Sequence, residues 1–115
     1  MEVKESEIRA VFLQVLIKAI KAGDIEELRQ LCGFAEAVVT TPETATGMTA
    51  LHYAAGLGAR EMVKILMAKG EFDLTLEDKW GRTAPALAVE VADDPVLGRY
   101  LYDKLYEQKT HAAAS

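Results

Sequence analysis

Hydrophobic residues along the chain recur at helical spacing in six stretches, which are separated by glycine, proline and charged residues. In the stretch GAREMVKILMAKG the apolar positions fall on one face of a helix, as expected for a helix with one buried side. These positions are Met62, Val63, Leu66 and Met67. The pattern predicts helices over residues 6–22, 24–31, 49–57, 59–68, 83–91 and 94–107. Ser6 and Asp24 are the expected N-caps of the first two helices.

The predicted helices form three similar pairs. The segments TGMTALHYAAGLG and WGRTAPALAVEVA align at an offset of 34 residues, which matches Gly47 with Gly81 and Thr49 with Thr83. A single short helix pair cannot bury its apolar face, so the three pairs are expected to stack and share one elongated core. The connections GFAEAVVTTPETATG and KGEFDLTLEDKWG carry glycine, proline and β-forming residues, which predicts extended, hairpin-like loops.

The middle pair resembles the ankyrin repeat. GMTALHYAAGLG followed by REMVKILMAKGEFDLTLED contains the T-x-L-H-x-A signature of that family, formed here by Thr49, Leu51 and His52. The outer units depart from the signature: the first lacks it, and the third has Pro85 and Ala86 in the places of Leu51 and His52. Terminal repeats are expected to be atypical because their outer faces meet no further unit. The resemblance predicts an all-α ankyrin-repeat solenoid of about three helix pairs joined by hairpin-like loops.

A chain of 115 residues fits one domain, which we place at residues 1–110. Its units are expected at about residues 6–43, 44–78 and 79–109, and residues 111–115 are expected to be a disordered tail. The loop before the third unit is one residue longer than the family spacing. We expect this insertion to push Phe72 outward.

Charge and composition narrow the class of partner. The formal net charge is −5 and the 13 basic residues are scattered, so the electrostatic footprint of a nucleic-acid or acidic-membrane binder is missing. Apolar runs are shorter than the roughly 18 to 20 residues that span a bilayer. The N-terminal residues do not resemble a secretory signal, and a single cysteine permits no internal disulfide. These features predict a cytoplasmic protein whose partner is a neutral or basic protein.

Candidate chemistry is sparse, and we expect no catalytic residues, metal site or cofactor. The resemblance implies that His52 and Thr49 form hydrogen bonds at the start of a helix, and one histidine cannot make a metal site. Cys32 occupies the apolar position equivalent to Met67, which predicts a buried, inert thiol instead of a nucleophile. An enzyme that uses Cys32 or His52 is therefore disfavoured.

The resemblance also implies where a partner binds, because ankyrin repeats usually recognise partners with hairpin tips and the exposed side of each first helix. The expected binding residues are Glu43, Thr46, Met48, Glu77, Lys79, Trp80 and Arg82. The expected structural residues of the motif are Gly47, Thr49, Leu51, His52, Gly81 and Thr83. Trp80 and Arg82 are the first choice, since these residue types are enriched in interface hot spots. Trp80 could equally pack on the neighbouring loop.

The predicted function is a non-catalytic scaffold module for protein–protein interaction. The alternative is a self-associating or regulatory domain of a larger polypeptide that uses its last helix. Tyr100, Tyr102 and Tyr106 lie on that helix at spacings that cannot all face inward. We expect Tyr100 to pack on the third unit, and Tyr102 or Tyr106 to stay accessible.

Overall fold

The computed structural model describes residues 4–34 and 36–114. Within these residues the secondary structure is entirely helical. The helices are α1 (Glu5–Ala22), α2 (Ile25–Phe34), α3 (Glu36–Val39), α4 (Ala50–Gly56), α5 (Arg60–Lys69), α6 (Ala84–Glu90) and α7 (Pro95–Ala114). None of the helices in this described part of the chain is long and apolar enough to cross a membrane.

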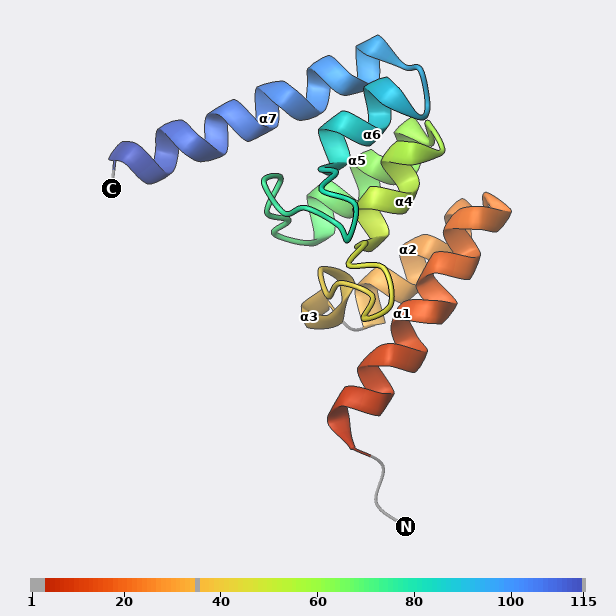
Figure 1. The fold of residues 1–115 in the computed structure, drawn as a ribbon. Helices are drawn as coiled ribbons and strands as arrows, with labels where there is room; N and C mark the ends of the chain where they lie inside the picture. The colour runs from red at the N-terminus through yellow and green to blue at the C-terminus, as the bar shows by residue number, and fades with distance from the viewer. Residues whose placement is uncertain (1–3, 35, 115) are drawn as a thin grey trace.

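The helices stack in pairs, as the sequence predicts. The first helices of the pairs pack side by side, α1 on α4 and α4 on α6, and the second helix α2 packs on α5. The long helices α1 and α7 lie at the two ends of the stack, with α4 and α5 between them (Figure 1). Two connections project from the stack, and we call residues 40–49 the first hairpin loop and residues 70–83 the second hairpin loop.

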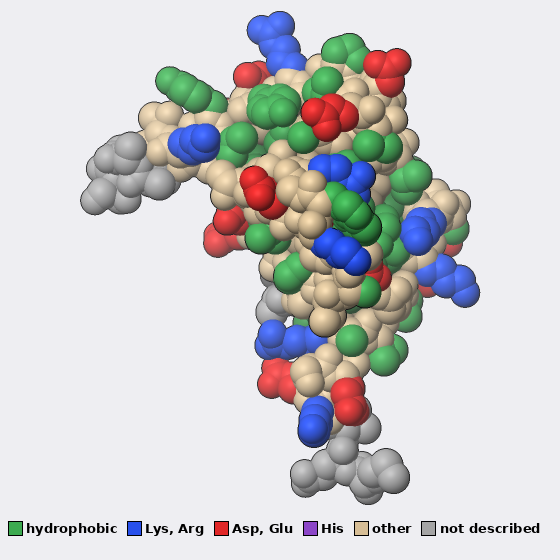
Figure 2. All heavy atoms as spheres, viewed as in Figure 1, with side chains coloured by type: hydrophobic (Ala, Val, Ile, Leu, Met, Phe, Trp, Pro, Cys, Tyr) green, Lys and Arg blue, Asp and Glu red, His purple; other side chains and the backbone are tan. Residues whose placement is uncertain are grey.

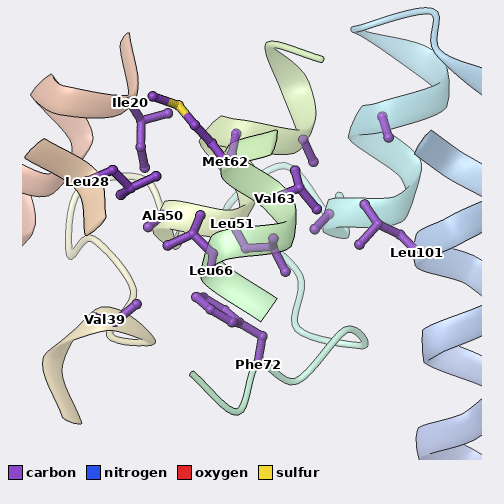
Figure 3. Packing of buried hydrophobic residues seen from close by; sticks show 14 of the residues in the cluster. Ile20, Leu28, Val39, Ala50, Leu51, Met62, Val63, Leu66, Phe72 and Leu101 are labelled. Atoms are coloured by element: carbon purple, nitrogen blue, oxygen red, sulfur yellow. The ribbon is translucent and has the colours of Figure 1, made fainter. Parts of the chain in front are cut away.

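One continuous core runs through all three pairs. Figure 3 shows Leu28 from the first pair, Leu51 and Leu66 from the middle pair, and Leu101 from the last. Each of these leucines is at most 1% exposed. The core joins the units because each pair leaves apolar side chains that only its neighbour can cover.

Polar side chains cap the N-termini of four of the helices. The hydroxyl oxygen of Thr49 accepts a hydrogen bond from the His52 amide at 3.3 Å, and that of Thr83 accepts one from the Ala86 amide at 3.3 Å. Asp24 and Asp94 cap α2 and α7 in the same way. Pro85 lies in the first turn of α6, where its missing N–H costs no helical hydrogen bond.

The predicted cap of the first helix is wrong. Helix α1 begins at Glu5, and its N-cap Lys4 makes no side-chain capping bond, so Ser6 lies inside the first turn. Glu5 and Glu7 place negative charge near the helix N-terminus, where the helix dipole favours it. These two acidic side chains offset part of the missing cap.

The first connection contains a short helix that the sequence pattern did not predict. Helix α3 occupies four residues of a segment expected to be an extended loop. Val39 at its end is fully buried and belongs to the core. Glutamate and alanine are strong helix formers, so a single turn forms as soon as tertiary packing covers its apolar end.

The expectation that Phe72 is pushed outward is also wrong, because Phe72 is only 4% exposed. The loop around Phe72 contacts the last helix. Gln108 donates a hydrogen bond from Nε2 to the Phe72 carbonyl oxygen at 2.6 Å, and its Oε1 accepts one from the Leu74 amide at 3.2 Å. This double contact holds the second hairpin loop against α7, and the Phe72 side chain packs in the core.

Helix α7 continues beyond the expected end at residue 107 and reaches Ala114, so it includes most of the segment expected to be disordered. No proline or glycine interrupts the sequence after residue 98. On this helix Tyr100 packs against the core, while Tyr102 and Tyr106 are 45% and 73% exposed. The predicted division of the tyrosines is confirmed.

Candidate functional site

The tip of the second hairpin loop is built around the buried carboxylate of Asp78. Its Oδ1 accepts hydrogen bonds from the backbone amides of Trp80 and Arg82, both at 2.9 Å, and its Oδ2 accepts one from Arg82 Nε at 2.9 Å. Burial raises the pKa of this carboxyl group, but the hydrogen bonds from Arg82 and Trp80 outweigh burial and hold the pKa below its ordinary value. Gly81 completes the turn at φ 76°, a left-handed conformation that favours glycine.

Trp80 lies on the surface of this rigid tip. It is 56% exposed, and its ring centre lies 5.0 Å from Arg82 Cζ and 5.3 Å from Lys79 Nζ. Cations at such distances are attracted to the face of an indole ring. Because Asp78 fixes Arg82, and Arg82 contacts the ring, the loop presents Trp80 in a defined orientation.

The tip of the first hairpin loop is organised by Glu43. Its Oε1 accepts hydrogen bonds from the hydroxyl groups of Thr46 at 2.6 Å and Tyr53 at 2.7 Å, and its Oε2 accepts one from Gln14 at 2.5 Å. Burial raises the pKa of the Glu43 carboxyl group, but these three hydrogen bonds outweigh burial and hold the pKa below its ordinary value. The carboxylate therefore links the loop to α1 and α4.

The two tips are joined directly. The Lys79 amide donates a hydrogen bond to the Thr46 carbonyl oxygen at 2.8 Å, and Arg82 Nη2 lies 4.0 Å from Met48 Sδ. Gly47 has a φ of 71°, and a Cβ atom there would lie 3.1 Å from the Lys79 amide nitrogen. Glycine is therefore required at position 47 both for the turn and for the close approach of the tips.

His52 fastens the base of the second hairpin loop to α4. Its Nδ1 accepts a hydrogen bond from the Thr49 amide at 3.2 Å, which leaves the proton on Nε2. The Nε2 lies 3.1 Å from both the Leu76 and the Arg82 carbonyl oxygens, so its proton is donated to this pair. His52 is 2% exposed. These hydrogen bonds lie where the ankyrin resemblance implies them for His52 and Thr49.

Burial of His52 leads to a prediction about pH. Burial lowers the pKa of His52 below its ordinary value of 6.5, and hydrogen bonds to the two carbonyl groups and the charge of Asp78 offset this only in part. The unfolded chain then binds a proton at a higher pH than the folded protein does. Acidification from about pH 7.5 to about pH 5.5 is expected to lower the free energy of unfolding by up to about 1.4 kcal/mol.

Urea titrations across this range measure the effect, in a His111→Gln background that leaves His52 as the one histidine. The lowered pKa values of Asp78 and Glu43 affect the free energy of unfolding in a separate, more acidic pH range, because carboxyl groups lose their stabilising charge only as the pH falls below about 4. A flat dependence between neutral pH and the carboxyl range would contradict the assignment to His52.

The structure brings the predicted binding residues together at two adjacent tips, but they differ in availability. Trp80, Lys79 and Glu77 are exposed, whereas Met48 and Arg82 are half-buried. The polar groups of Glu43, Thr46 and Arg82 are also engaged in bonds within the protein. On the face shown in Figure 2, basic, acidic and hydrophobic side chains are interspersed. Their role as partner-binding residues stays a prediction.

Cys32 is buried, as the sequence predicts. It is 0% exposed, and burial raises the pKa of its thiol, although the charge of Lys69 opposes this. A buried thiol with a raised pKa is a poor source of thiolate. Neither Cys32 nor His52 is therefore presented to a substrate.

Sequence reasoning missed a link between the second and third units. Arg60 donates hydrogen bonds from Nε and Nη2 to the two carboxylate oxygens of Asp94, both at 2.7 Å, and Asp94 also caps α7. The two residues are separated by 34 positions, which is the offset of the repeat. Opposite charges at equivalent positions of consecutive units were thus the signal that could have predicted this contact.

The structure defines the class of protein as a helical-repeat solenoid whose hairpin tips are joined side by side. A family profile described as ankyrin repeats in three copies matches residues 15–112. The chain therefore belongs to the ankyrin-repeat family, whose repeats are generally protein–protein interaction modules and typically non-catalytic. The comparison with curated proteins finds no significant match.

Proposed function

We propose that this chain is a non-catalytic interaction module that binds a protein partner through its hairpin tips and the adjoining faces of the first helices. Trp80 is the central contact. The observation that carries this proposal is its combination of exposure with a fixed orientation, imposed by Asp78 and Arg82. A large planar side chain that is already ordered loses little conformational entropy on binding.

Lys79 and Glu77 extend the contact beside Trp80, and Thr46 and Met48 extend it on the neighbouring tip. The net charge of −5 favours the approach of a neutral or basic protein over long distances. The proposal extends to a scaffold role in the cytoplasm, which the single cysteine favours. Arg82 contributes by positioning Trp80, because its guanidinium is bonded to Asp78.

Replacing Trp80 with alanine tests the proposal. We expect partner affinity to fall by about 2 kcal/mol, or roughly 30-fold, as is typical of a central aromatic contact. Partners captured from native lysate are compared between wild type and Trp80→Ala by quantitative mass spectrometry, and the dissociation constant of the main partner is then measured with purified protein. Unchanged capture by a folded Trp80→Ala variant would place the binding surface elsewhere.

A second candidate function is self-association through α7. The observation that favours it is the exposure of Tyr102 and Tyr106 on one end of the stack. Under this proposal, sedimentation velocity shows a concentration-dependent dimer that Tyr106→Ala weakens and Trp80→Ala leaves intact. A strictly monomeric species at every concentration would remove this candidate. The two variants thus serve as controls for each other.

A further inference from the structure

Helix α1 departs from the repeat pattern by its length. It has 18 residues, whereas the equivalent first helices α4 and α6 have seven each. The family match begins at residue 15, so the N-terminal half of α1 lies before the matched region. In Figure 1 this half of the helix extends away from the stack, past the first hairpin loop.

A groove lies between this half of α1 and the first hairpin loop. Its volume is about 360 Å³. Apolar groups of Ala10 and Leu13 on the helix and of Pro42 and Ala45 on the loop line it. Arg9 lies at its rim with a side chain that is 45% exposed. The groove thus offers an apolar surface next to a cation.

The stacking of the hairpin tips indicates what fits this groove. The second hairpin loop joins the first by one main-chain hydrogen bond, from the Lys79 amide to the Thr46 carbonyl oxygen. At the repeat offset of 34 residues, the amide that corresponds to Lys79 is that of Ala45. Among the described residues, the Ala45 amide donates no hydrogen bond, and Ala45 lines the groove. The Ala45 amide, which corresponds to the donor that joins consecutive tips, is therefore available to a partner.

We propose that the groove binds an extended segment of a partner protein, whose main-chain carbonyl oxygen accepts a hydrogen bond from the Ala45 amide. An apolar side chain of the segment covers the exposed Ala10 and Pro42. Main-chain hydrogen bonds supply affinity in this mode of recognition, and the side-chain pocket supplies selectivity. An extended chain is the appropriate occupant because the equivalent amide in the next loop already pairs with main chain in that way.

The positive charge of Arg9 adds a preference for an acidic residue in the segment. Arg9 forms an ion pair with Glu5 at 2.8 Å, but Glu5 is 79% exposed, and such exposed pairs contribute little. The acid on the other rim, Glu43, is bonded to Gln14, Thr46 and Tyr53. A carboxylate of the segment can therefore pair with the planar guanidinium of Arg9. The segment takes the form of an apolar residue with an acidic neighbour, within a partner that is neutral or basic as a whole.

This inference rests on the proposed function, because it assigns a second contact site for a protein partner at the N-terminal side of the stack. The test uses phage-displayed libraries of short linear peptides, selected on the full chain. Enriched peptides are synthesised and titrated into wild type and four variants. Ala10→Trp fills the groove and Ala45→Pro removes the amide donor. Ala68→Trp is the matched control, at an exposed position of α5. Trp80→Ala removes the other proposed contact site.

The expected result is enrichment of peptides that combine an apolar and an acidic residue and bind wild type, Ala68→Trp and Trp80→Ala equally. Ala10→Trp abolishes their binding, and Ala45→Pro weakens it about fivefold to tenfold, the value of one hydrogen bond. In wild-type protein, the Ala45 amide proton shifts downfield in nitrogen–proton correlation spectra as peptide is added. This shift also reports on the donor if Ala45→Pro disturbs the loop.

Three outcomes would overturn the proposal. In the first, no peptide is enriched. In the second, the enriched peptides bind Ala10→Trp as tightly as wild type. In the third, the peptides bind at a hairpin tip instead of in the groove. Peptides lost with Trp80→Ala but retained with Ala10→Trp would refute the groove and still support the proposed function. Peptides lost only with Ala10→Trp, together with unchanged lysate capture by Trp80→Ala, would refute the role of Trp80 and leave the groove in place.

Discussion

Replacing His52 with alanine is expected to lower the free energy of unfolding by about 3 to 5 kcal/mol, the sum of a buried cavity, a lost cap and an unpaired carbonyl group. His52 is buried and bonded at both ring nitrogens. Its loss leaves the Leu76 carbonyl oxygen without a donor, while the Arg82 carbonyl oxygen keeps the hydrogen bond from the Asp78 amide. Urea unfolding monitored by far-ultraviolet circular dichroism measures the change, which is a large share of the stability of a small domain.

The third unit supplies the control for this prediction. Ala86 stands where the repeat offset would place a second histidine, and the described residues contain no later hairpin loop for such a side chain to hold. Ala86→His should therefore give no gain in stability. A His52→Ala variant within about 1 kcal/mol of wild type would show that the Leu76 carbonyl group finds another donor, since one net hydrogen bond has that value.

Replacing Asp78 with alanine is expected to lower the free energy of unfolding by about 3 kcal/mol, because hydrogen bonds to a buried charged group are among the stronger ones. The change removes three hydrogen bonds and leaves Arg82 without its carboxylate. Trp80 and the loop around it then lose their fixed conformation. Urea unfolding gives the stability, and acrylamide quenching of Trp80, the single tryptophan, reports the loss of order.

Asp78→Asn is the matched variant. Its remaining side-chain oxygen can still accept hydrogen bonds from the Trp80 and Arg82 amides, but it carries no charge to pair with the Arg82 guanidinium. We expect it to lose about half as much stability as Asp78→Ala and to keep the quenching behaviour of wild type. Equal losses for the two variants would mean that the ion pair, and not the amide contacts, holds the tip.

Much of the fold could be predicted from the sequence because its information is local and periodic. The apolar spacing located six of the seven helices in the described part of the chain, and the offset that relates Gly47 to Gly81 revealed the repeat. The T-x-L-H element led us to expect hydrogen bonds of Thr49 and His52 at the start of a helix, and both residues form bonds there. Exposure of Tyr106 followed from the geometry of a helix that has only one buried side.

The candidate site was less predictable. The sequence located the tips and Trp80, but it did not reveal that Glu43 and Arg82 are already bonded within the protein. Their partners lie between 3 and 29 residues away along the chain, and charge alone does not distinguish a binding residue from a supporting one. Asp78, which organises the second hairpin loop, lay next to the predicted residues and was not singled out.

By itself, the sequence determined the repeat, the helix pairs, the buried face of each helix and the positions of the two hairpin tips, because spacing along the chain encodes all of these. Only the tertiary structure decided the inward position of Phe72, the bond from Gln108 that holds it, and the groove beside α1. These features depend on side chains from different units meeting in space. The availability of Trp80 was decided in the same way, by the packing of Arg82 and Lys79 around its ring.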